Sequence, residues 1–387
     1  MNFVFLSPHF PSNFYQFAVA LRSVGANVLG LADENYASLR PELGEALTEY
    51  YRVSDMHNYD ELVRALGYFT HRYGKLDRID SHNEYWLETE ARLRTDFNIA
   101  GVRMDQIERI KRKSLMKETY RNAGVKTARG GLVRTLDDAL AIVQQTGYPL
   151  VAKPDIGVGA AATYKIHDLN ELQSFFDTKP AVDYMLEEFV DGIVVTYDGL
   201  TDANGVPVFT NSLQYSAGIM ETVLDDDLIY YYTQRDIPAE VDALGRRVLK
   251  AFDVRERFFH FEFFRQKGSN ELIALEVNMR PPGGFTTDMF NYACDIDIYY
   301  AWACILAGRE FPYPDYSHKY FCGYASRKSN RMYKHDGHEI FAAFGDKICV
   351  HADISGIFSA ALGNEGYIFR SPNLDEIVAM ANYMQAQ

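Results

Sequence analysis

Three polar residues alternate in a short stretch of the C-terminal half, LEVNMRPPGG (residues 275–284). Successive side chains of a strand point to opposite faces, so Glu276, Asn278 and Arg280 are expected on one face and the apolar residues between them, beginning with Leu275, on the other. One face of this strand therefore carries groups able to do chemistry. The competing interpretation is an edge strand with a polar outer face, and the surrounding elements must decide between the two.

A hairpin is expected to bring a second carboxylate to this face. The runs FFHFEFFRQ and ELIALEVN, joined by KGSN, indicate two antiparallel strands, and a turn around Ser269 places Glu262 almost opposite Glu276, with Cβ atoms about 5 Å apart. Such carboxylates repel each other unless a cation lies between them, and with Asn278 they offer the oxygen ligands that suit Mg²⁺. The alternative is that one carboxylate is solvated and the other is paired with Arg265 or Arg280. The large apolar residues around both acids argue against it.

A glycine-bearing turn, GVGAAATYKI, follows the expected strand YPLVAKPDI. Backbone amides in such a turn can hold phosphate, with Lys153 on the strand adding charge. A plain hairpin turn is the alternative.

Composition excludes several classes of protein. The chain has 387 residues, 47% apolar and 24% charged, which is enough for two or three domains, and its net charge of -14 argues against nucleic acid or anionic membrane as a partner. The start, MNFVFLSPHF, has no basic leader, and no run of about 18 apolar residues occurs. We expect a cytoplasmic protein with reduced thiols, because its cysteines are widely spaced: Cys294, Cys304, Cys322 and Cys349.

Alternating strand and helix patterns over residues 1–100 predict an open parallel α/β domain. SPHFPSN follows the first strand in place of G-x-G-x-x-G, which argues against a dehydrogenase. The triplet 82–84 (His-Asn-Glu) follows a strand end, where such sheets bind ligands, although a solvated helix start explains it equally well. Farther on we expect a basic helical stretch, RIKRKSLMKETYRNAG, ending at Gly124, a helix at 136–146, and a hairpin turning at Asn204-Gly205.

The order of four motifs resembles the ATP-grasp superfamily, in particular its carboxylate-amine ligases and its members related to carbamoyl-phosphate synthase and biotin carboxylase. The motifs are Lys113 before a helix ending in AGV, then VAKPDIGVGAA, LEEFVDG, and HFEFF with LEVNMRP. The resemblance covers roughly residues 1 to 310. It implies an α/β and α+β multidomain fold, in which a two-lobed ATP-grasp module with antiparallel sheets follows the α/β domain. The expected boundaries are 1–100, 101–185 (small lobe), 186–310 (large lobe) and 311–387 (closing segment).

The resemblance also implies roles for the matching residues. Lysines hold the nucleotide phosphates under a mobile glycine-rich loop (157–162), an acid accepts from the adenine amino group, and backbone groups of the hinge contact the base. These nucleotide-binding residues are Lys113, Lys153, Gly157, Gly159, Glu187, Glu188 and Val190. The implied ligands of Mg²⁺, or of Mn²⁺ in its place, are Glu262, Glu276 and Asn278, and Arg280 steadies the transferring phosphoryl group. Val194 stands where the family commonly has a ribose-binding glutamate, which leaves Asp198 as an open alternative.

The implied activity is an ADP-forming carbon–nitrogen ligase. ATP phosphorylates a small carboxylate, and an amine then displaces phosphate from the acyl-phosphate. A bicarbonate-activating carboxylase or carbamoyl-phosphate-type enzyme is one alternative, and a non-catalytic nucleotide-binding regulator is another. The expected partners are small molecules, with a homodimer left open. Residues 283–288 (GGFTTD) are expected to contact substrate, and the basic run ASRKSNRMYKH forms either an anion pocket or a solvated face.

Overall fold

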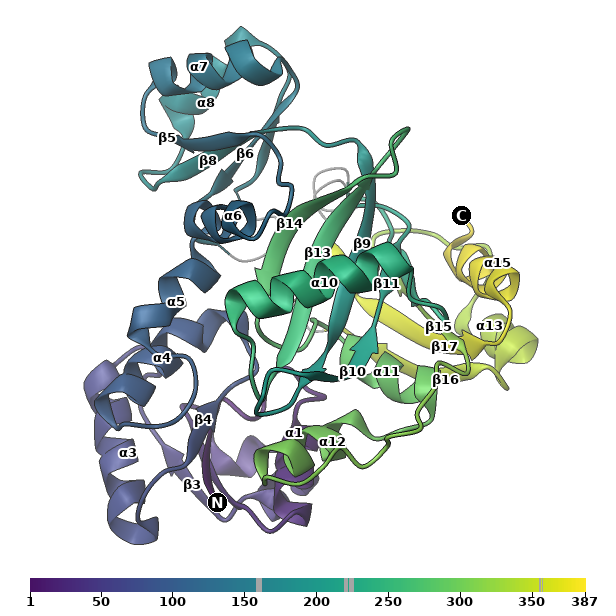
Figure 1. The fold of residues 1–387 in the computed structure, drawn as a ribbon. Helices are drawn as coiled ribbons and strands as arrows, with labels where there is room; N and C mark the ends of the chain where they lie inside the picture. Colours follow the sequence, from purple (N-terminus) through teal and green to yellow (C-terminus); the bar gives the residue numbers. More distant parts are fainter. Residues whose placement is uncertain (158–161, 219–221, 223–225, 355, 357) are drawn as a thin grey trace.

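The computed structural model describes residues 1–157, 162–218, 222, 226–354, 356 and 358–387. Figure 1 shows an N-terminal domain below a large sheet, with a small lobe projecting away from both. The described residues form three sheets: a parallel one at the N-terminus, an antiparallel one in the small lobe, and a large one of nine strands. The predicted fold class, an open α/β domain followed by antiparallel lobes, is confirmed.

The N-terminal sheet has the strand order β3-β2-β1-β4, and its pairs are parallel. Its central strands are almost continuously apolar because helices cover both faces: Phe3 and Phe5 pack toward α1 and α12, and Val4 and Leu6 pack toward α3. The elements are β1 (Asn2–Leu6), α1 (Tyr15–Ser23), β2 (Asn27–Ala32), η1 (Tyr36–Ser38), α2 (Pro41–Ala46), β3 (Glu49–Arg52), α3 (Tyr59–Tyr73), β4 (Arg78–Asp80), η2 (Glu84–Trp86) and α4 (Leu87–Asp96).

The small lobe follows two short helices and packs its own helices against one face of a sheet ordered β5-β8-β6-β7. Its helix α7 has the predicted bounds, because Thr135 and Asp138 form a capping box at its start. The elements are α5 (Met104–Lys111), α6 (Lys113–Asn122), β5 (Gly130–Val133), α7 (Leu136–Thr146), β6 (Leu150–Pro154), β7 (Tyr164–Ile166), α8 (Leu169–Thr178) and β8 (Tyr184–Glu188).

The basic run predicted to be helical consists of two helices. Arg112 is extended (φ -84°, ψ 116°) between α5 and α6, and the amide of Lys113 donates to Asp155 O at 2.9 Å. The break aims the start of α6 at the small lobe. As predicted, the segment ends at Gly124, whose φ is +67°.

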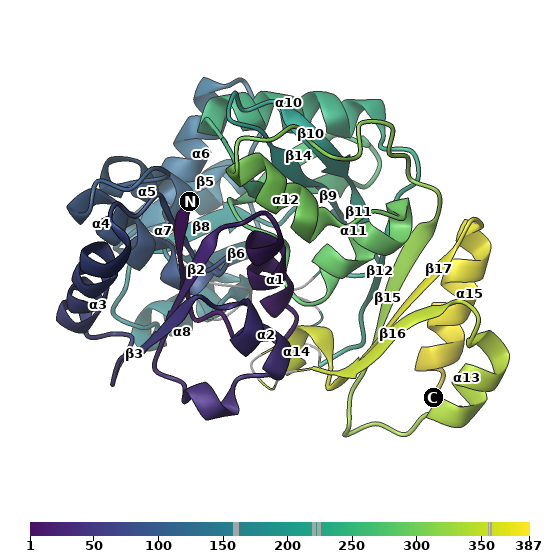
Figure 2. The same ribbon diagram turned by 90° about the horizontal axis from the view of Figure 1, so that it is seen from below.

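The large sheet has the order β14-β13-β9-β11-β12-β15-β17-β16, with β10 paired to β9. Helix α10 covers one face, and α11 and α12 cover the other and reach the N-terminal domain, where α12 lies against α1 (Figure 2). The elements are β9 (Gly192–Thr201), β10 (Pro207–Asn211), β11 (Leu213–Tyr215), β12 (Tyr230–Thr233), α10 (Ala239–Phe252), β13 (Phe258–Gln266), β14 (Leu272–Asn278), α11 (Thr286–Cys294) and α12 (Ile298–Leu306).

The C-terminal region continues this sheet instead of forming a separate layer. Strand β15 pairs with β12 and with β17, and α15 packs against β15 and β17. The elements are β15 (Phe321–Arg327), α13 (Gly337–Phe344), β16 (Ile348–Asp353), α14 (Ser359–Leu362), β17 (Glu365–Ser371) and α15 (Leu374–Gln385). None of the helices in the described part of the chain is long and apolar enough to cross a membrane.

Candidate active site

The β13–β14 hairpin places its acids as the sequence predicts. Glu262 is the direct cross-strand partner of Glu276, and His260 is the partner of Asn278. The register shifts just beyond this pair, where Phe263 faces Ala274, so Leu275 has no partner and forms a bulge. The simple alternation predicted for the stretch is therefore wrong at Leu275, which is half-buried, while Val277 and Met279 are in the core.

Each carboxylate on this face has a cation beside it. Lys113 Nζ lies 3.2 Å from Glu276 Oε1, and His260 Nε2 lies 3.0 Å from Glu262 Oε1. The predicted repulsion between the two acids is therefore relieved by protein cations. Burial would raise the pKa of Glu262, but the hydrogen bond from His260 and the charges of His260, Arg280 and Lys153 hold it below its usual value.

Arg280 joins this face to the N-terminal domain. Its Nη2 donates to Asn278 Oδ1 at 3.2 Å and its Nε donates to Glu84 Oε2 at 3.2 Å. Glu84 opens η2, directly after the loop that follows β4. The 82–84 triplet therefore does not form a solvated helix start: His82 is buried and Glu84 contacts Arg280.

His260 received no role from its sequence context, yet it connects three strands. Its Nδ1 lies 2.5 Å from Asp198 Oδ1, on the neighbouring strand β9. Burial alone would lower the pKa of His260, but Asp198 and Glu262 outweigh it and raise that pKa to about 9. Asp198 is fully buried and also accepts from Thr196 Oγ1, so its carboxylate is occupied by protein groups and not open to a ribose.

A second charged cluster lies in the small lobe around Glu187. Lys117 Nζ is 2.7 Å from Glu187 Oε1, and Lys153 Nζ is 3.1 Å from Glu187 Oε2. All three residues are buried. Burial favours the neutral acid, but the two ammonium groups lower the pKa of Glu187; burial also lowers the pKa of Lys117, to about 8.

Lys117 was missed by sequence reasoning. It lies one helical turn after Lys113, and residues four apart share a helix face, so this spacing was the available signal. The two lysines point to different clusters, because Lys113 reaches Glu276 and Lys117 reaches Glu187. Two cations thus face one carboxylate in the small lobe, a ratio that favours binding a further anion.

Lys113 also contacts the start of the glycine-rich turn. Its Nζ donates to Gly157 O at 3.2 Å. Asp155 fixes the start of α6 beside this turn. Its Oδ1 accepts from the amide of Ser114 at 2.8 Å, and its Oδ2 accepts from Arg112 Nη1 at 3.2 Å. Gly157 is exposed, and Gly159 lies outside the described residues.

The segment after β8 links the two lobes. Glu188 accepts from the backbone and side chain of Arg129 at 2.8 and 2.7 Å, and Val190 packs with Ala128 and Ile273 of the large sheet. Gly130, with φ +151°, lets β5 lie close to β8, since a Cβ at this position would be 2.1 Å from Leu186 O.

The donor set on the hairpin fits a hard cation. Two facing carboxylates and the amide oxygen of Asn278 are ligands of the kind that Mg²⁺ takes, with phosphate oxygens as its usual further ligands. Across the described ranges, no three His, Cys, Asp or Glu side chains converge into a metal cluster, so the fit depends on Asn278 and on ligand oxygens as well as on the two acids.

Residues 146–288 match the family of ATP-grasp domains. These residues form an ATP-grasp domain. The domain contains Lys153, Glu187 and the whole β13–β14 hairpin, whereas Lys113 is supplied by the segment before it.

Relatives and solved structures agree with this assignment. The L-arginine-specific L-amino acid ligase of Bacillus subtilis is 25% identical over 236 residues, covering 59% of this chain and 57% of that protein. A carbamoyl phosphate synthase large chain, C-terminal section, of Aquifex aeolicus is 24% identical over 188 residues, covering 47% of this chain and 34% of that protein. The matches thus span between one third and little more than half of these relatives' length.

The fold as a whole extends beyond the matched domain. The crystal structure of an L-amino acid ligase from Bacillus licheniformis superposes with a TM-score of 0.75 at 15% identity, covering 98% of this chain and 96% of that one. The N-terminal domain and the C-terminal strands therefore share the fold of that ligase.

Proposed function

We propose that this protein is an ATP-dependent ligase that activates a small carboxylate as an acyl-phosphate and joins it to an amine. The observation that carries the proposal is the direct pairing of Glu262 with Glu276 on adjacent strands, with Asn278, Arg280 and Lys113 in contact with that face. Relatives named as L-amino acid ligases support an amino-acid-like substrate.

The charged residues of the site suit both steps of the reaction, phosphorylation of the carboxylate and its displacement by the amine. Lys113 and Lys153 would hold nucleotide phosphates, each giving up a carboxylate partner for a phosphate oxygen. Arg280, positioned by Glu84 and Asn278, would neutralise charge on the group in transfer. The substrate carboxylate attacks the γ-phosphorus and ADP leaves; the amine then attacks the acyl carbon and phosphate leaves. The protein's contribution is positioning and charge neutralisation.

Glu262, Glu276 and Asn278 would hold Mg²⁺, or Mn²⁺ in its place. The cation, when bound, supplies positive charge that draws the nucleotide phosphates to this face. The ammonium of Lys113 now beside Glu276 would then be available for phosphate. The hinge residues Glu188 and Val190 would contact the base through their backbone, and Gly157 and Gly159 would belong to the loop over the phosphates.

The chemistry is tested by following ADP release in a panel of amino acids and small carboxylates, each with and without an amine. Hydroxylamine in place of the amine should give a hydroxamate, and oxygen-18 in the substrate carboxylate should appear in the released phosphate. Formation of AMP and pyrophosphate would contradict the proposal, because it indicates adenylation. Release of ADP with bicarbonate alone would instead support the carboxylase alternative.

The proposal also includes the substrates' form, the cellular location and the assembly of the enzyme. We expect free small molecules as substrates and a cytoplasmic enzyme, and a homodimer remains to be tested. Light scattering on the purified chain measures the assembly, and fractionation of the cells measures the location.

A further inference from the structure

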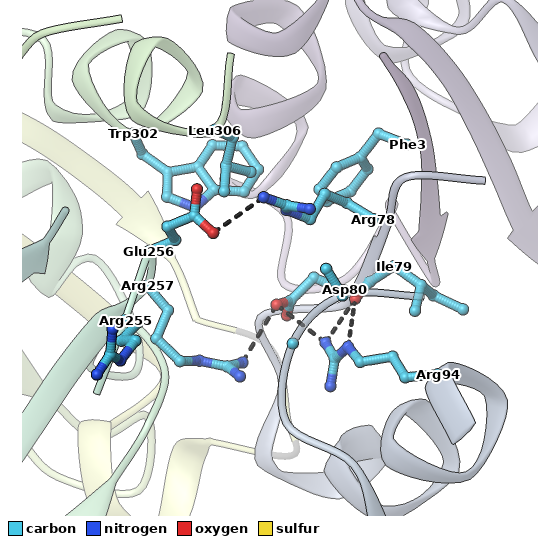
Figure 3. Close-up of a pocket in the computed structure, with 12 residues that line it drawn as sticks. Phe3, Arg78, Ile79, Asp80, Arg94, Arg255, Glu256, Arg257, Trp302 and Leu306 are labelled. Atoms are coloured by element: carbon cyan, nitrogen blue, oxygen red, sulfur yellow. Dashed lines mark hydrogen bonds and ion pairs between the residues drawn. The ribbon is translucent and has the colours of Figure 1, made fainter. Parts of the chain in front are cut away.

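A small pocket lies between the N-terminal domain and the large sheet, away from the β13–β14 acids. Its cavity holds about 40 Å³. Figure 3 shows that its walls come from β4 and its surroundings on one side and from the segment before β13 and helix α12 on the other. Its charged lining residues are Arg78, Arg94, Arg255 and Arg257, with the carboxylates Asp80 and Glu256.

Most of these charges are already paired. Arg78 Nη2 lies 2.9 Å from Glu256 Oε2, and Arg255 turns outward to Asp253. Arg94 is satisfied by Glu90 at 2.9 Å, by Asp80 at 3.3 Å and by backbone carbonyl groups. Asp80 is in turn shared between Arg94 and Arg257, and its Oδ1 accepts from the amide of His82 at 2.9 Å.

Arg257 is paired with Asp80 but, in the part of the chain that the structure describes, leaves most of its donors unused. It is only 8% exposed, and within the described residues its guanidinium makes one hydrogen bond, from Nη2 to Asp80 Oδ2 at 3.2 Å. Its Nε is buried without an acceptor. A guanidinium has five N–H donors, and a buried donor without an acceptor costs about 1–3 kcal/mol. Arg257 lines the pocket and extends across it toward Asp80 (Figure 3), so the end of its guanidinium lies at the cavity, whereas Nε is enclosed by protein atoms.

We propose that this pocket binds a small oxyanion, either inorganic phosphate or the carboxylate of a small metabolite, through the guanidinium of Arg257. The fork of an arginine matches two oxygens of a carboxylate or phosphate. The size is suitable, because one water needs about 10–15 Å³ of such space and the cavity has room for several atoms.

The site is separate from the nucleotide site. Arg257 precedes Glu262 by five residues, which corresponds to roughly 17 Å along an extended strand. An anion held there would touch both β4 of the N-terminal domain and the entry to β13, so it would tie the two domains together. Binding to this pocket does not depend on the ligase chemistry proposed above.

The test is thermal unfolding of the full chain during titration with sodium phosphate and, separately, sodium acetate, with sodium chloride at matched ionic strength as reference. We expect a saturable rise in Tm with one or both oxyanions. If only phosphate raises Tm, the ligand is phosphate. If acetate also raises Tm and competes with phosphate, the pocket accepts carboxylates as well. The absence of any saturable rise beyond chloride would overturn the proposal and leave water as the occupant.

Four variants locate the effect. Arg257→Met should weaken the apparent Kd at least tenfold, and Arg257→Lys, which keeps the charge but loses the fork, should weaken it as well even if the methionine variant unfolds. Arg255→Met, an outward-facing arginine of the same wall, should bind as the wild type does. Lys153→Met should also retain the rise in Tm; its loss there would assign the anion to the nucleotide site and refute the pocket. Wild-type affinity in Arg257→Lys would refute it equally.

Discussion

The small-lobe cluster around Glu187 and the hairpin face around Glu262 and Glu276 differ in their balance of charge: the first has more cations than carboxylates, and the second has a cation beside each carboxylate. In the small lobe, two lysines share one buried carboxylate. On the hairpin, two carboxylates face each other, and their cations come from His260 on the same strand and from Lys113 on α6. Under the proposed function, the first arrangement would receive the phosphates and the second, with its two facing carboxylates, the cation.

Lys113 connects the hairpin face to the start of the glycine-rich turn in the small lobe. Its ammonium contacts Glu276 of the large sheet and the Gly157 carbonyl of the small lobe. A phosphate chain with its cation has the complementary pattern of charges, negative toward the lysines and positive toward the acids. Each half of the proposed site is held by internal ion pairs, whose partners a charged ligand would replace.

The largest effect is expected from removing charge on the hairpin. Glu276→Gln should lower turnover by at least about a hundredfold, because a ligand carboxylate is worth more than the outer partners whose loss costs about 10–100-fold. Thermal stability should change little, since Lys113 loses only one partly exposed contact. Steady-state kinetics at saturating Mg²⁺ and unfolding without ligand measure the two effects. Retained turnover with a large loss of stability would make Glu276 a structural ion-pair partner only.

Removing a cation from the small lobe should act on binding. Lys153→Met should weaken ATP affinity roughly tenfold to a hundredfold, the loss of a charge-assisted contact of about 1.5–3 kcal/mol. A position at a strand end would indicate a peripheral lysine, but Lys153 is buried against Glu187. Some stability should therefore be lost as well.

Lys117→Met is the matched control for that prediction. Lys117 is more deeply buried and closer to Glu187, at 2.7 Å, so its loss should destabilise the fold more than the loss of Lys153 does. Calorimetric titration with ATP and thermal unfolding of both variants separate binding from stability. Equal ATP affinity in wild type and Lys153→Met would contradict the phosphate role.

His260 should make stability depend on pH. Its pKa is raised from 6.5 to about 9 in the folded chain, so its contribution is fully present below pH 6.5 and is lost as pH rises toward 9. The loss is on the order of 3 kcal/mol, and His260→Gln should not show it. Lys117, with a lowered pKa of about 8, works in the opposite direction above pH 8. The measurement is therefore the difference in the free energy of unfolding between wild type and His260→Gln, from urea unfolding at pH 6 to 9. A difference that stays constant with pH would contradict the assignment of a charged His260.

The smallest effect is expected at the hinge. Glu188→Ala removes an ion pair with Arg129, whose side chain is 61% exposed, and should change the free energy of unfolding by less than about 1 kcal/mol. ATP affinity should be unchanged, because the proposed contact with the base uses the backbone. Loss of ATP binding in this variant would show that the Glu188 side chain contacts ATP directly, in addition to the backbone.

Local patterns in the sequence were sufficient for the hairpin register and for helix α7. The short KGSN turn fixes which residues face each other, and the capping box fixes where α7 begins. The break at Arg112 was not predictable, because it depends on a bond from Lys113 to Asp155, 42 residues along the chain. The bulge at Leu275 and the contact of Lys117 with Glu187 likewise depend on how separate strands and helices meet.

The strand order of the large sheet bears on how the chain can be divided. Strand β12 separates β11 from β15, so a fragment ending near residue 310 would leave the aromatic strand Tyr230–Thr233 as a bare edge. Exposed apolar edges of this kind recruit strands from other molecules. A recombinant fragment that stops after α12 should therefore precipitate or associate, even though it retains the residues proposed to bind ATP. Shortening the protein for crystallography would have to spare β15 at least, because that strand covers the edge.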